Sequence, residues 1–249
     1  MTLSDNKKLI IANFDQAATS YDAYADVQKE IAATLRKIVR EHLPLARDIV
    51  EIGCGTGLFT EHLHSLYPQA EIFATDISKN MVRECSHKFR ANERLHYNIC
   101  DGEFLFLPRQ VDLIASNLAF QWFEYLHKSI RKLWPQTHSL AFTVFLEGSF
   151  SSWKAAYNDK EEGNVMHPLL SPYEFQDLCN SFDAKKKIVK FQTISRRHLC
   201  ATDFLHTLRE IGAQTPQPGR SPKNLRKVLN QFPNGIEINY EVGYGLLLR

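Results

Sequence analysis

The sequence lacks the features that would indicate an exported or membrane-bound protein. No apolar run approaches the about 18 residues that a membrane-spanning helix requires, and the N-terminus lacks the long apolar core of a signal peptide. The five cysteines are scattered, and no two of them form a C-x-x-C pair. Such a set favours reduced thiols over a disulfide framework or a zinc site. We therefore expect a cytoplasmic protein that binds no metal.

The sequence also lacks a strong charge, internal repeats and low-complexity segments. Its formal net charge is only +2, so nothing global indicates a nucleic acid or a membrane surface as the partner. With 249 residues, 44% of them hydrophobic, the chain is long enough to bury a substantial core as one monomeric α/β domain. We predict an N-terminal helical arm over 1–45, a core over 46–147, and a C-terminal part of the sheet with helical cap insertions over 148–249.

What the sequence does contain is a glycine-rich turn after a short apolar segment. Residues 48–52 favour a strand, and Gly53, Gly55 and Gly57 follow at alternate positions before an amphipathic helical segment. This is the layout of a nucleotide-binding βα unit. The spacing departs from G-x-G-x-x-G, and no Gly-Lys-Ser/Thr follows, so neither a dinucleotide fingerprint nor a P-loop is present. The pattern Glu51-x-Gly-x-Gly-x-Gly resembles the first motif of the S-adenosylmethionine (SAM) methyltransferases.

Acidic residues follow the next two predicted strands. Asp76 ends the strand over 71–75, roughly 20 residues beyond the glycines, where this fold places a carboxylate on ribose hydroxyls. It could instead cap a helix, a role that Ser78 could also fill. Asp101 follows the strand over 96–100 and could accept a hydrogen bond from an adenine amino group. Its alternative is a simple Asp-Gly turn.

The strand predicted over 111–115 is apolar throughout, as expected for a strand covered on both faces. It leads to Gln121 and Trp122, which become pocket candidates because ligands of open α/β sheets lie at the carboxyl ends of the strands. A buried structural role is the alternative for Trp122.

The C-terminal third predicts helices between strands. Ser171-Pro-Tyr-Glu174 is typical of a helix start. A strand is expected over about 188–195, helices over 202–212 and 221–232, and a last strand over 236–248. We interpret the two helices as a cap over the strand ends.

Four segments make the resemblance more specific. Residues 14–22, 116–122, 208–213 and 239–246 resemble the corresponding parts of the malonyl-[acyl-carrier protein] O-methyltransferases of biotin synthesis. The resemblance implies a Rossmann-like class I methyltransferase, with a mostly parallel seven-stranded sheet, helices on both faces, an N-terminal helical arm and a small cap. Glu51 stands where aspartate is usual in that family, and Phe120 replaces an aliphatic residue.

The resemblance also implies site residues. Those expected at SAM are Tyr21, Gln28, Glu51, Gly53, Cys54, Gly55, Gly57, Asp76, Ile77, Met81, Asp101, Gly102 and Asn117. Those expected at the substrate are Phe120, Gln121, Trp122, Arg196 and Arg197.

In this family the substrate's free carboxylate attacks the SAM methyl group, giving a methyl ester and S-adenosylhomocysteine. Because a malonyl carboxylate is already ionised at neutral pH, no general base is needed, and Gln121, Trp122 and Tyr21 would orient the reactants. An arginine fork could hold a carboxylate, with Arg196 and Arg197 first and Arg209 and Arg220 next. A solvated strand end is the alternative for Arg196 and Arg197.

The implied partner is malonyl-acyl-carrier protein or malonyl-coenzyme A. A carrier protein is acidic, so basic side chains could guide docking, although charge runs are usually solvated faces. The candidates are Lys223, Arg226 and Lys227 on one predicted helix, and Lys185, Lys186, Lys187 and Lys190. Two other hypotheses stay open: a methyltransferase for another small carboxylic acid or metabolite, and a non-catalytic assembly factor with a SAM fold.

Overall fold

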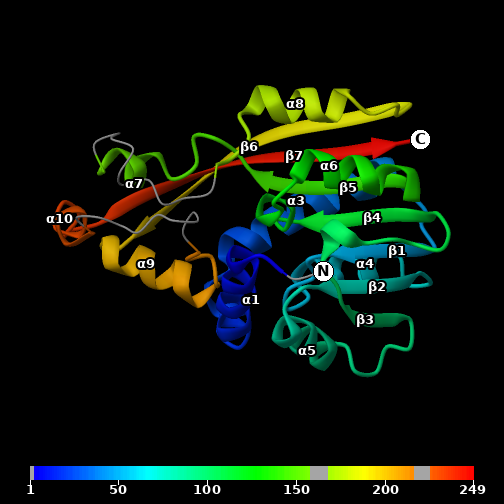
Figure 1. The fold of residues 1–249 in the computed structure, drawn as a ribbon, viewed down its shortest axis with the longest axis horizontal. Coiled ribbons are helices and arrows are strands. Elements are labelled where there is room, and N and C mark those ends of the chain that lie inside the picture. The colour runs from blue at the N-terminus through cyan, green and yellow to red at the C-terminus, as the bar shows by residue number, and fades with distance from the viewer. Residues whose placement is uncertain (1–2, 158–167, 216–224) are drawn as a thin grey trace.

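The computed structural model describes residues 3–157, 168–215 and 225–249, and its centre is a seven-stranded sheet (Figure 1). The strands are β1 (Asp48–Ile52), β2 (Glu71–Asp76), β3 (Leu95–Ile99), β4 (Val111–Asn117), β5 (Thr137–Phe145), β6 (Lys186–His198) and β7 (Ile236–Leu248). Their order across the sheet is β3-β2-β1-β4-β5-β7-β6. Strand β7 runs antiparallel to the other six strands, which all run in the same direction. The predicted fold class is confirmed.

Helices cover both faces of this sheet (Figure 1). Helices α3, α4 and α5 pack on one face, and α6 and α8 pack on the other. No helix in the described part of the chain is both long and apolar enough to cross a membrane. The helices are α1 (Asp5–Ala17), α2 (Tyr21–Tyr24), α3 (Asp26–His42), α4 (Leu58–Leu66), α5 (Lys79–Lys88), α6 (Leu126–Leu133), α7 (Ser151–Ala155), α8 (Pro172–Asn180), α9 (Ala201–Glu210) and α10 (Leu225–Leu229), with short 3-10 turns η1 (Gly102–Phe104), η2 (Phe120–Trp122) and η3 (Trp134–Gln136).

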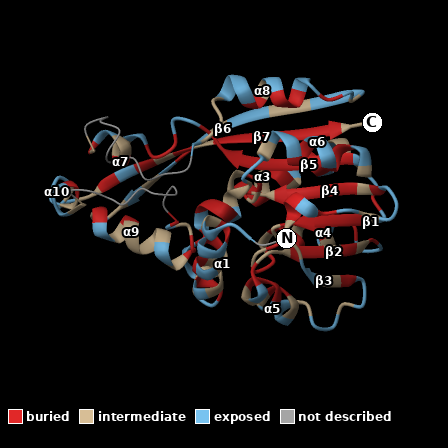
Figure 2. Ribbon diagram, viewed as in Figure 1, coloured by how far each residue is buried: buried red, intermediate tan, exposed pale blue. Residues whose placement is uncertain are grey.

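The central strands are buried on both sides, as their apolar sequences predict (Figure 2). Side chains alternate between two cores, because successive residues of a strand point to opposite faces. Ile49 and Leu113 join the core under α3 and α4, whereas Val50 and Ile114 join the core under α6 and α8.

Helix α8 begins where its sequence predicts. The Ser171 hydroxyl accepts a hydrogen bond from the Glu174 N–H, and the Glu174 carboxylate accepts one from the Ser171 N–H. This reciprocal pair is a complete capping box, which satisfies two backbone donors at the start of the helix.

Strands β6 and β7 form a long antiparallel pair that reaches beyond the rest of the sheet (Figure 1). Helices α7, α9 and α10 lie against its outer half and form the predicted cap. Phe204 of α9, Val228 of α10 and Ile238 of β7 are buried together there. Helix α10 is described from Leu225, and the predicted start of that helix at Ser221 lies outside the described residues.

Candidate functional site

The glycine turn leaves β1 in a conformation that suits glycine. Gly53, Gly55 and Gly57 all have positive φ, at 75°, 53° and 96°. A Cβ on Gly53 would lie 2.2 Å from the Cβ of Ala119, so no larger residue fits there without a shift of the backbone. The N–H groups of Gly53 and Cys54 both donate to the Thr75 carbonyl, at 2.8 and 2.9 Å. The turn is therefore fixed to the end of β2, where Asp76 lies.

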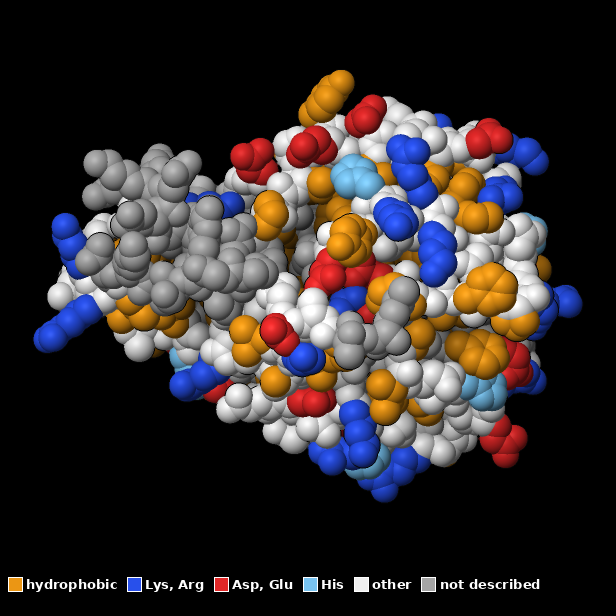
Figure 3. All heavy atoms as spheres, viewed as in Figure 1, with side chains coloured by type: hydrophobic (Ala, Val, Ile, Leu, Met, Phe, Trp, Pro, Cys, Tyr) orange, Lys and Arg blue, Asp and Glu red, His pale blue; other side chains and the backbone are white. Residues whose placement is uncertain are grey.

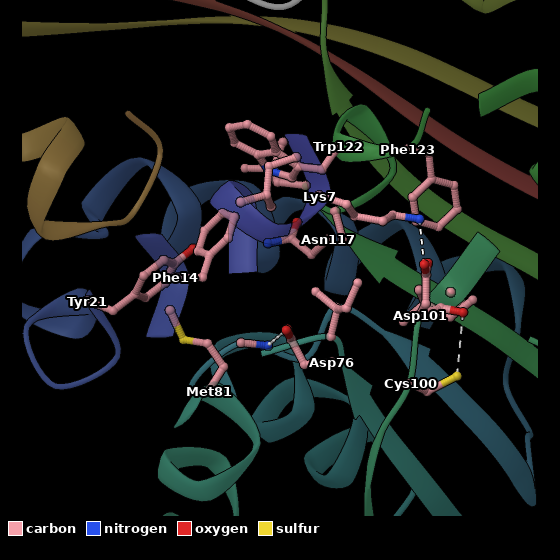
Figure 4. Close-up of a pocket in the computed structure, with 18 residues that line it drawn as sticks. Lys7, Phe14, Tyr21, Asp76, Met81, Cys100, Asp101, Asn117, Trp122 and Phe123 are labelled. Atoms are coloured by element: carbon pink, nitrogen blue, oxygen red, sulfur yellow. Dashed lines mark hydrogen bonds and ion pairs between the residues drawn. The ribbon is translucent and has the colours of Figure 1, made fainter. Parts of the chain in front are cut away.

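Asp76 holds the glycine turn and faces the same space as the turn (Figure 4). Its carboxylate accepts hydrogen bonds from the Gly55 N–H at 2.9 Å and from the Ser78 N–H at 2.8 Å. Ser78, not Asp76, caps α5, since its hydroxyl accepts from the Met81 N–H. Burial raises the pKa of Asp76 to about 6, although the backbone N–H groups of Ser78, Gly55 and Ile77 oppose the shift. The helix-cap alternative for Asp76 is thus excluded, and the ribose contact stays a prediction.

A first cavity of about 90 Å³ lies at the carboxyl ends of β1, β2 and β4, beneath α1 (Figure 4). Its position is the one expected for a ligand of an open α/β sheet. The residues that line it are Lys7, Ile10, Phe14, Tyr21, Ile52, Gly53, Gly55, Asp76, Ile77, Met81, Cys100, Asp101, Gly102, Asn117, Leu118, Ala119, Trp122 and Phe123.

A second, larger cavity of about 310 Å³ lies between the sheet and the cap. Its wall is mostly apolar and aromatic, with a few neutral polar groups. It shares Phe14, Tyr21, Leu118 and Trp122 with the first cavity, so the two spaces meet at these residues. The other residues that line it are Gln28, Gln121, Phe145, Phe150, Trp153, Tyr157, Leu169, Leu205, Leu208, Ile211, Ala213, Gln214, Thr215, Leu225 and Tyr240.

The structure brings together most of the site residues expected from the sequence. The second cavity contains Gln28 and Gln121, and the Asn117 side chain donates to the Gln28 carbonyl at 3.4 Å, which links the end of β4 to α3. The first cavity contains ten of them, namely Tyr21, Gly53, Gly55, Asp76, Ile77, Met81, Asp101, Gly102, Asn117 and Trp122.

Four expected residues lie beside the cavities and line neither of them. Glu51 is fully buried beneath the turn, where the Thr60 hydroxyl donates to its carboxylate at 2.6 Å. Burial raises the pKa of Glu51 to about 8. Cys54 is buried as well, and Gly57 starts α4. Phe120 packs in the core against two other phenylalanine rings and lines neither cavity. Direct ligand contacts from these residues stay predictions.

Arg196 and Arg197 do not follow a strand as expected, because β6 continues through both of them to His198. The Arg196 guanidinium forms an ion pair with Glu30 of α3, and Arg197 is exposed. Neither lines a described cavity. The runner-up Arg209 lies on α9 beside His206 and Glu210, and Arg220 lies outside the described residues.

Residues that sequence reasoning did not select come mainly from α1 and from the turn after β4. Phe14 contacts the Trp122 ring edge-to-face, at 5.4 Å between centroids. The Lys7 ammonium donates to the Asp101 carboxylate (Figure 4). The pattern of α1 gave no signal for Lys7, since Lys7 and Lys8 are chemically identical neighbours. The others are Ile10, Ile52, Cys100, Leu118, Ala119 and Phe123.

Tyr21 lies at the meeting point of the two cavities and stays a neutral phenol. Burial raises the pKa of its hydroxyl far above its ordinary value, and the negative charges of Asp76 and Asp22 raise it further. Tyr21 therefore cannot act as a base at neutral pH. It can donate a hydrogen bond and exclude water.

Comparison with known proteins shows which proteins this chain is similar to. The family described as “Methyltransferase domain” matches residues 49–137. The malonyl-[acyl-carrier protein] O-methyltransferase of Priestia megaterium is 30% identical over 94% of this chain and 95% of its own length. The protein of that name from Anoxybacillus flavithermus is 37% identical over 91% and 89%. The structure of the plantazolicin methyltransferase BpumL in complex with SAH superposes with a TM-score of 0.53, at 17% identity, covering 99% of this chain and 91% of that one.

A glycine turn fixed to an acidic strand end, in a sheet of this order, defines a class I methyltransferase that uses SAM. Within that class, the chain belongs to the malonyl-[acyl-carrier protein] O-methyltransferase family. The first cavity fits the donor. Gly53, Asp76, Ile77 and Met81 all line it, and the contacts of Asp76 with the ribose hydroxyls and of Ile77 and Met81 with the adenine ring stay predictions.

The pKa of Asp76 predicts that cofactor binding depends on pH. In the predicted contact, ribose hydroxyls donate to the ionised carboxylate of Asp76, and protonation of the carboxylate competes with them. Because the pKa in the free protein is raised to about 6, affinity is full above this pH and is lost as the pH falls through it. We expect the Kd for S-adenosylhomocysteine to rise by up to about tenfold per pH unit below that point. Calorimetric titration between about pH 5 and pH 7 measures this, and Asp76→Asn should flatten the profile. An unchanged slope in Asp76→Asn would assign the titration to another group.

Proposed function

We propose that the enzyme transfers the methyl group of SAM to the free carboxylate of a malonyl thioester on acyl-carrier protein, yielding the malonyl methyl ester. The observation that carries this proposal is the similarity along nearly the whole chain, cap included, to proteins named for this reaction. Masking the malonyl charge would let fatty-acid synthesis extend the ester toward pimeloyl and biotin. A cytoplasmic location and a monomeric state remain predictions.

The chemistry requires alignment and no proton transfer. When bound, SAM supplies an electrophilic methyl group on a positively charged sulfur. The attacking carboxylate is ionised at neutral pH, so the neutral Tyr21 is sufficient at the junction. Phe14, Tyr21, Leu118 and Trp122 surround the point where the two cavities meet and exclude water from it. Orientation of this kind can contribute on the order of 7–11 kcal/mol.

The second cavity suits a carboxylate that has to remain reactive. Its described wall contains no lysine or arginine, so the expected arginine fork is absent from that part of the wall. Neutral groups replace it. Gln121 accepts a hydrogen bond from the Phe145 N–H at 3.4 Å, which orients its amide. The Tyr157 hydroxyl is buried, with no partner among the described residues. Neutral donors can hold an oxygen without neutralising its charge, and an apolar wall removes its hydration.

We propose that the carrier protein docks on the cap. Arg226 and Lys227 are exposed on α10, whose Leu225 lines the second cavity (Figure 3 shows basic side chains at this tip). A negative partner docked there would present its thioester to the cavity. Lys223 lies outside the described residues. The cluster of Lys185, Lys186, Lys187 and Lys190 is exposed at the start of β6. The start of β6 lies at the end of the sheet opposite the cavities, so we do not assign docking to this cluster.

The decisive test is incubation with SAM and malonyl-acyl-carrier protein, followed by mass spectrometry. We expect the thioester to gain the mass of one CH₂ unit and S-adenosylhomocysteine to accumulate in equal amount. Malonyl-coenzyme A tests the carrier, and acetyl-acyl-carrier protein, which has no free carboxylate, is the matched negative control. Methylation of a different carboxylic acid, with none of the malonyl thioester, would overturn the proposal that malonyl is the methyl acceptor. Retention of SAM without turnover of any acid would favour an assembly factor.

A further inference from the structure

Lys7 is a buried cation at one end of the cofactor cavity. Only 5% of the residue is exposed, and its Nζ lies 2.5 Å from Asp101 Oδ2 and 2.5 Å from Glu103 Oε2. The same Nζ lies 5.2 Å from the centre of the Phe104 ring, which covers it from the outside. Figure 4 shows the side chain extending from α1 across the cavity to Asp101.

The burial of Lys7 is specific, because its neighbour is chemically identical and exposed. The Lys8 side chain is 60% exposed, and its one ion pair among the described residues is with Asp5, within its own helix. Burial works against the charge of Lys7, but the carboxylates of Asp101 and Glu103 outweigh it and raise its pKa. Lys7 thus remains an ammonium group between two carboxylates.

The two carboxylates depend on Lys7 to different degrees. Glu103 also accepts hydrogen bonds from the N–H groups of Glu124 and Tyr125 and from the Ser129 hydroxyl. Asp101 has fewer partners, since one oxygen accepts from the Glu103 N–H at 3.1 Å and the other accepts from Lys7. Without Lys7, Asp101 would keep one backbone contact and would face the Glu103 charge without a cation between them.

We propose that Lys7 is a positioning residue for the cofactor, which holds the Asp101 carboxylate in the orientation that accepts the adenine amino group. Each carboxylate oxygen has a second lone pair, so Asp101 can receive the amino group while it keeps its present partners. The proposal rests on the predicted adenine contact of Asp101 and is independent of the acyl substrate.

The position of Lys7 on α1 couples this recognition to the N-terminal arm. The same helix is fixed elsewhere by Asp15, which accepts from the Ser78 hydroxyl at 2.5 Å and from the Asn80 N–H at 3.0 Å, and by Asn13, which donates to Thr215 at 2.8 Å. A position of α1 away from the sheet would leave Asp101 without its cation. On this proposal, adenine recognition is complete only when the arm covers the cavity, as it does in this structure.

The test compares Lys7→Met with Lys8→Met, a matched control on the exposed side of the same helix. Calorimetry measures the Kd of S-adenosylhomocysteine and of S-inosylhomocysteine, in which an oxygen replaces the adenine amino group. Wild type should prefer the adenosyl ligand, because only that ligand has the amino donor. We expect Lys7→Met to weaken adenosyl binding by about tenfold or more, to weaken inosyl binding much less, and so to reduce the preference.

Lys7→Arg should retain part of the preference, and Lys8→Met should match wild type in both affinities. A thermal melt of each variant without ligand separates folding from binding. Equal loss of both ligands in Lys7→Met would overturn the proposal and leave Lys7 a structural role. So would a wild-type protein with no adenosyl preference, or Lys7→Met with unchanged affinities. Because no acyl substrate is present, these outcomes are independent of whether malonyl is the methyl acceptor.

Discussion

Asp76→Ala should raise the Kd for SAM by at least about 100-fold. The change removes an ionised acceptor from both ribose hydroxyls, and hydrogen bonds to a charged group contribute about 1.5–3 kcal/mol each. It also releases the Gly55 N–H from its 2.9 Å hydrogen bond, which loosens the glycine turn. Calorimetric titration with SAM or S-adenosylhomocysteine measures the loss.

Asp112→Ala is the matched control for that experiment. Asp112 also accepts two backbone hydrogen bonds, from the N–H groups of Arg47 at 2.7 Å and Asp48 at 3.1 Å. It does so at the amino ends of the central strands, away from the cofactor cavity. This variant should lose stability and keep its cofactor affinity. If Asp76→Ala bound SAM as tightly as Asp112→Ala does, Asp76 would not be the ribose acceptor.

Gly53→Ala should both destabilise the protein and abolish detectable cofactor binding. The new Cβ would lie 2.2 Å from the Cβ of Ala119, and the residue would be held at a φ of 75°. A left-handed conformation costs a non-glycine residue about 1–2 kcal/mol, and overpacking costs about 1–3 kcal/mol more. For a chain of this size the sum corresponds to a fall in Tm of about 5–15 °C. Differential scanning calorimetry and SAM titration measure the two effects.

Gly55→Ala separates the two parts of that prediction. Its Cβ would meet no atom within 4 Å, although its φ of 53° is also positive. We expect a smaller fall in Tm with a clear loss of SAM affinity, because Gly55 lines the cofactor cavity. A Gly53→Ala protein with the Tm of Gly55→Ala would show that the turn can move away from Ala119.

The sequence predicted the cofactor half of the site well because that half depends on local order. A strand, a glycine turn and an acidic residue at the next strand end are close in sequence, and parallel strands bring their carboxyl ends to one edge. Gly53, Asp76 and Asp101 therefore lie together as expected. The long last strand was also predictable, and α9 lies where a helix was expected.

The remaining errors concern long-range contacts. Lys7 and Lys8 cannot be told apart until α1 is placed over the sheet, and the partners of Lys7 lie more than ninety positions away. Arg196 was expected to hold substrate because it was predicted to follow the penultimate strand and to adjoin the cap. In the folded chain the strand continues, and Glu30 of α3 neutralises Arg196. Such pairings follow from tertiary packing, which the local pattern does not encode.

The antiparallel pair of β6 and β7 has a consequence for how such enzymes diversify. Both strands run unbroken from the sheet into the cap, so one wall of the second cavity, represented by Tyr240, is an extension of the sheet, whereas the facing wall contains separate short helices. Substitutions in the facing wall can change which acid is accepted without altering the glycine turn or Asp76. Exchange of the cap helices between relatives should therefore transfer the preference for the acid substrate and leave the affinity for SAM unchanged.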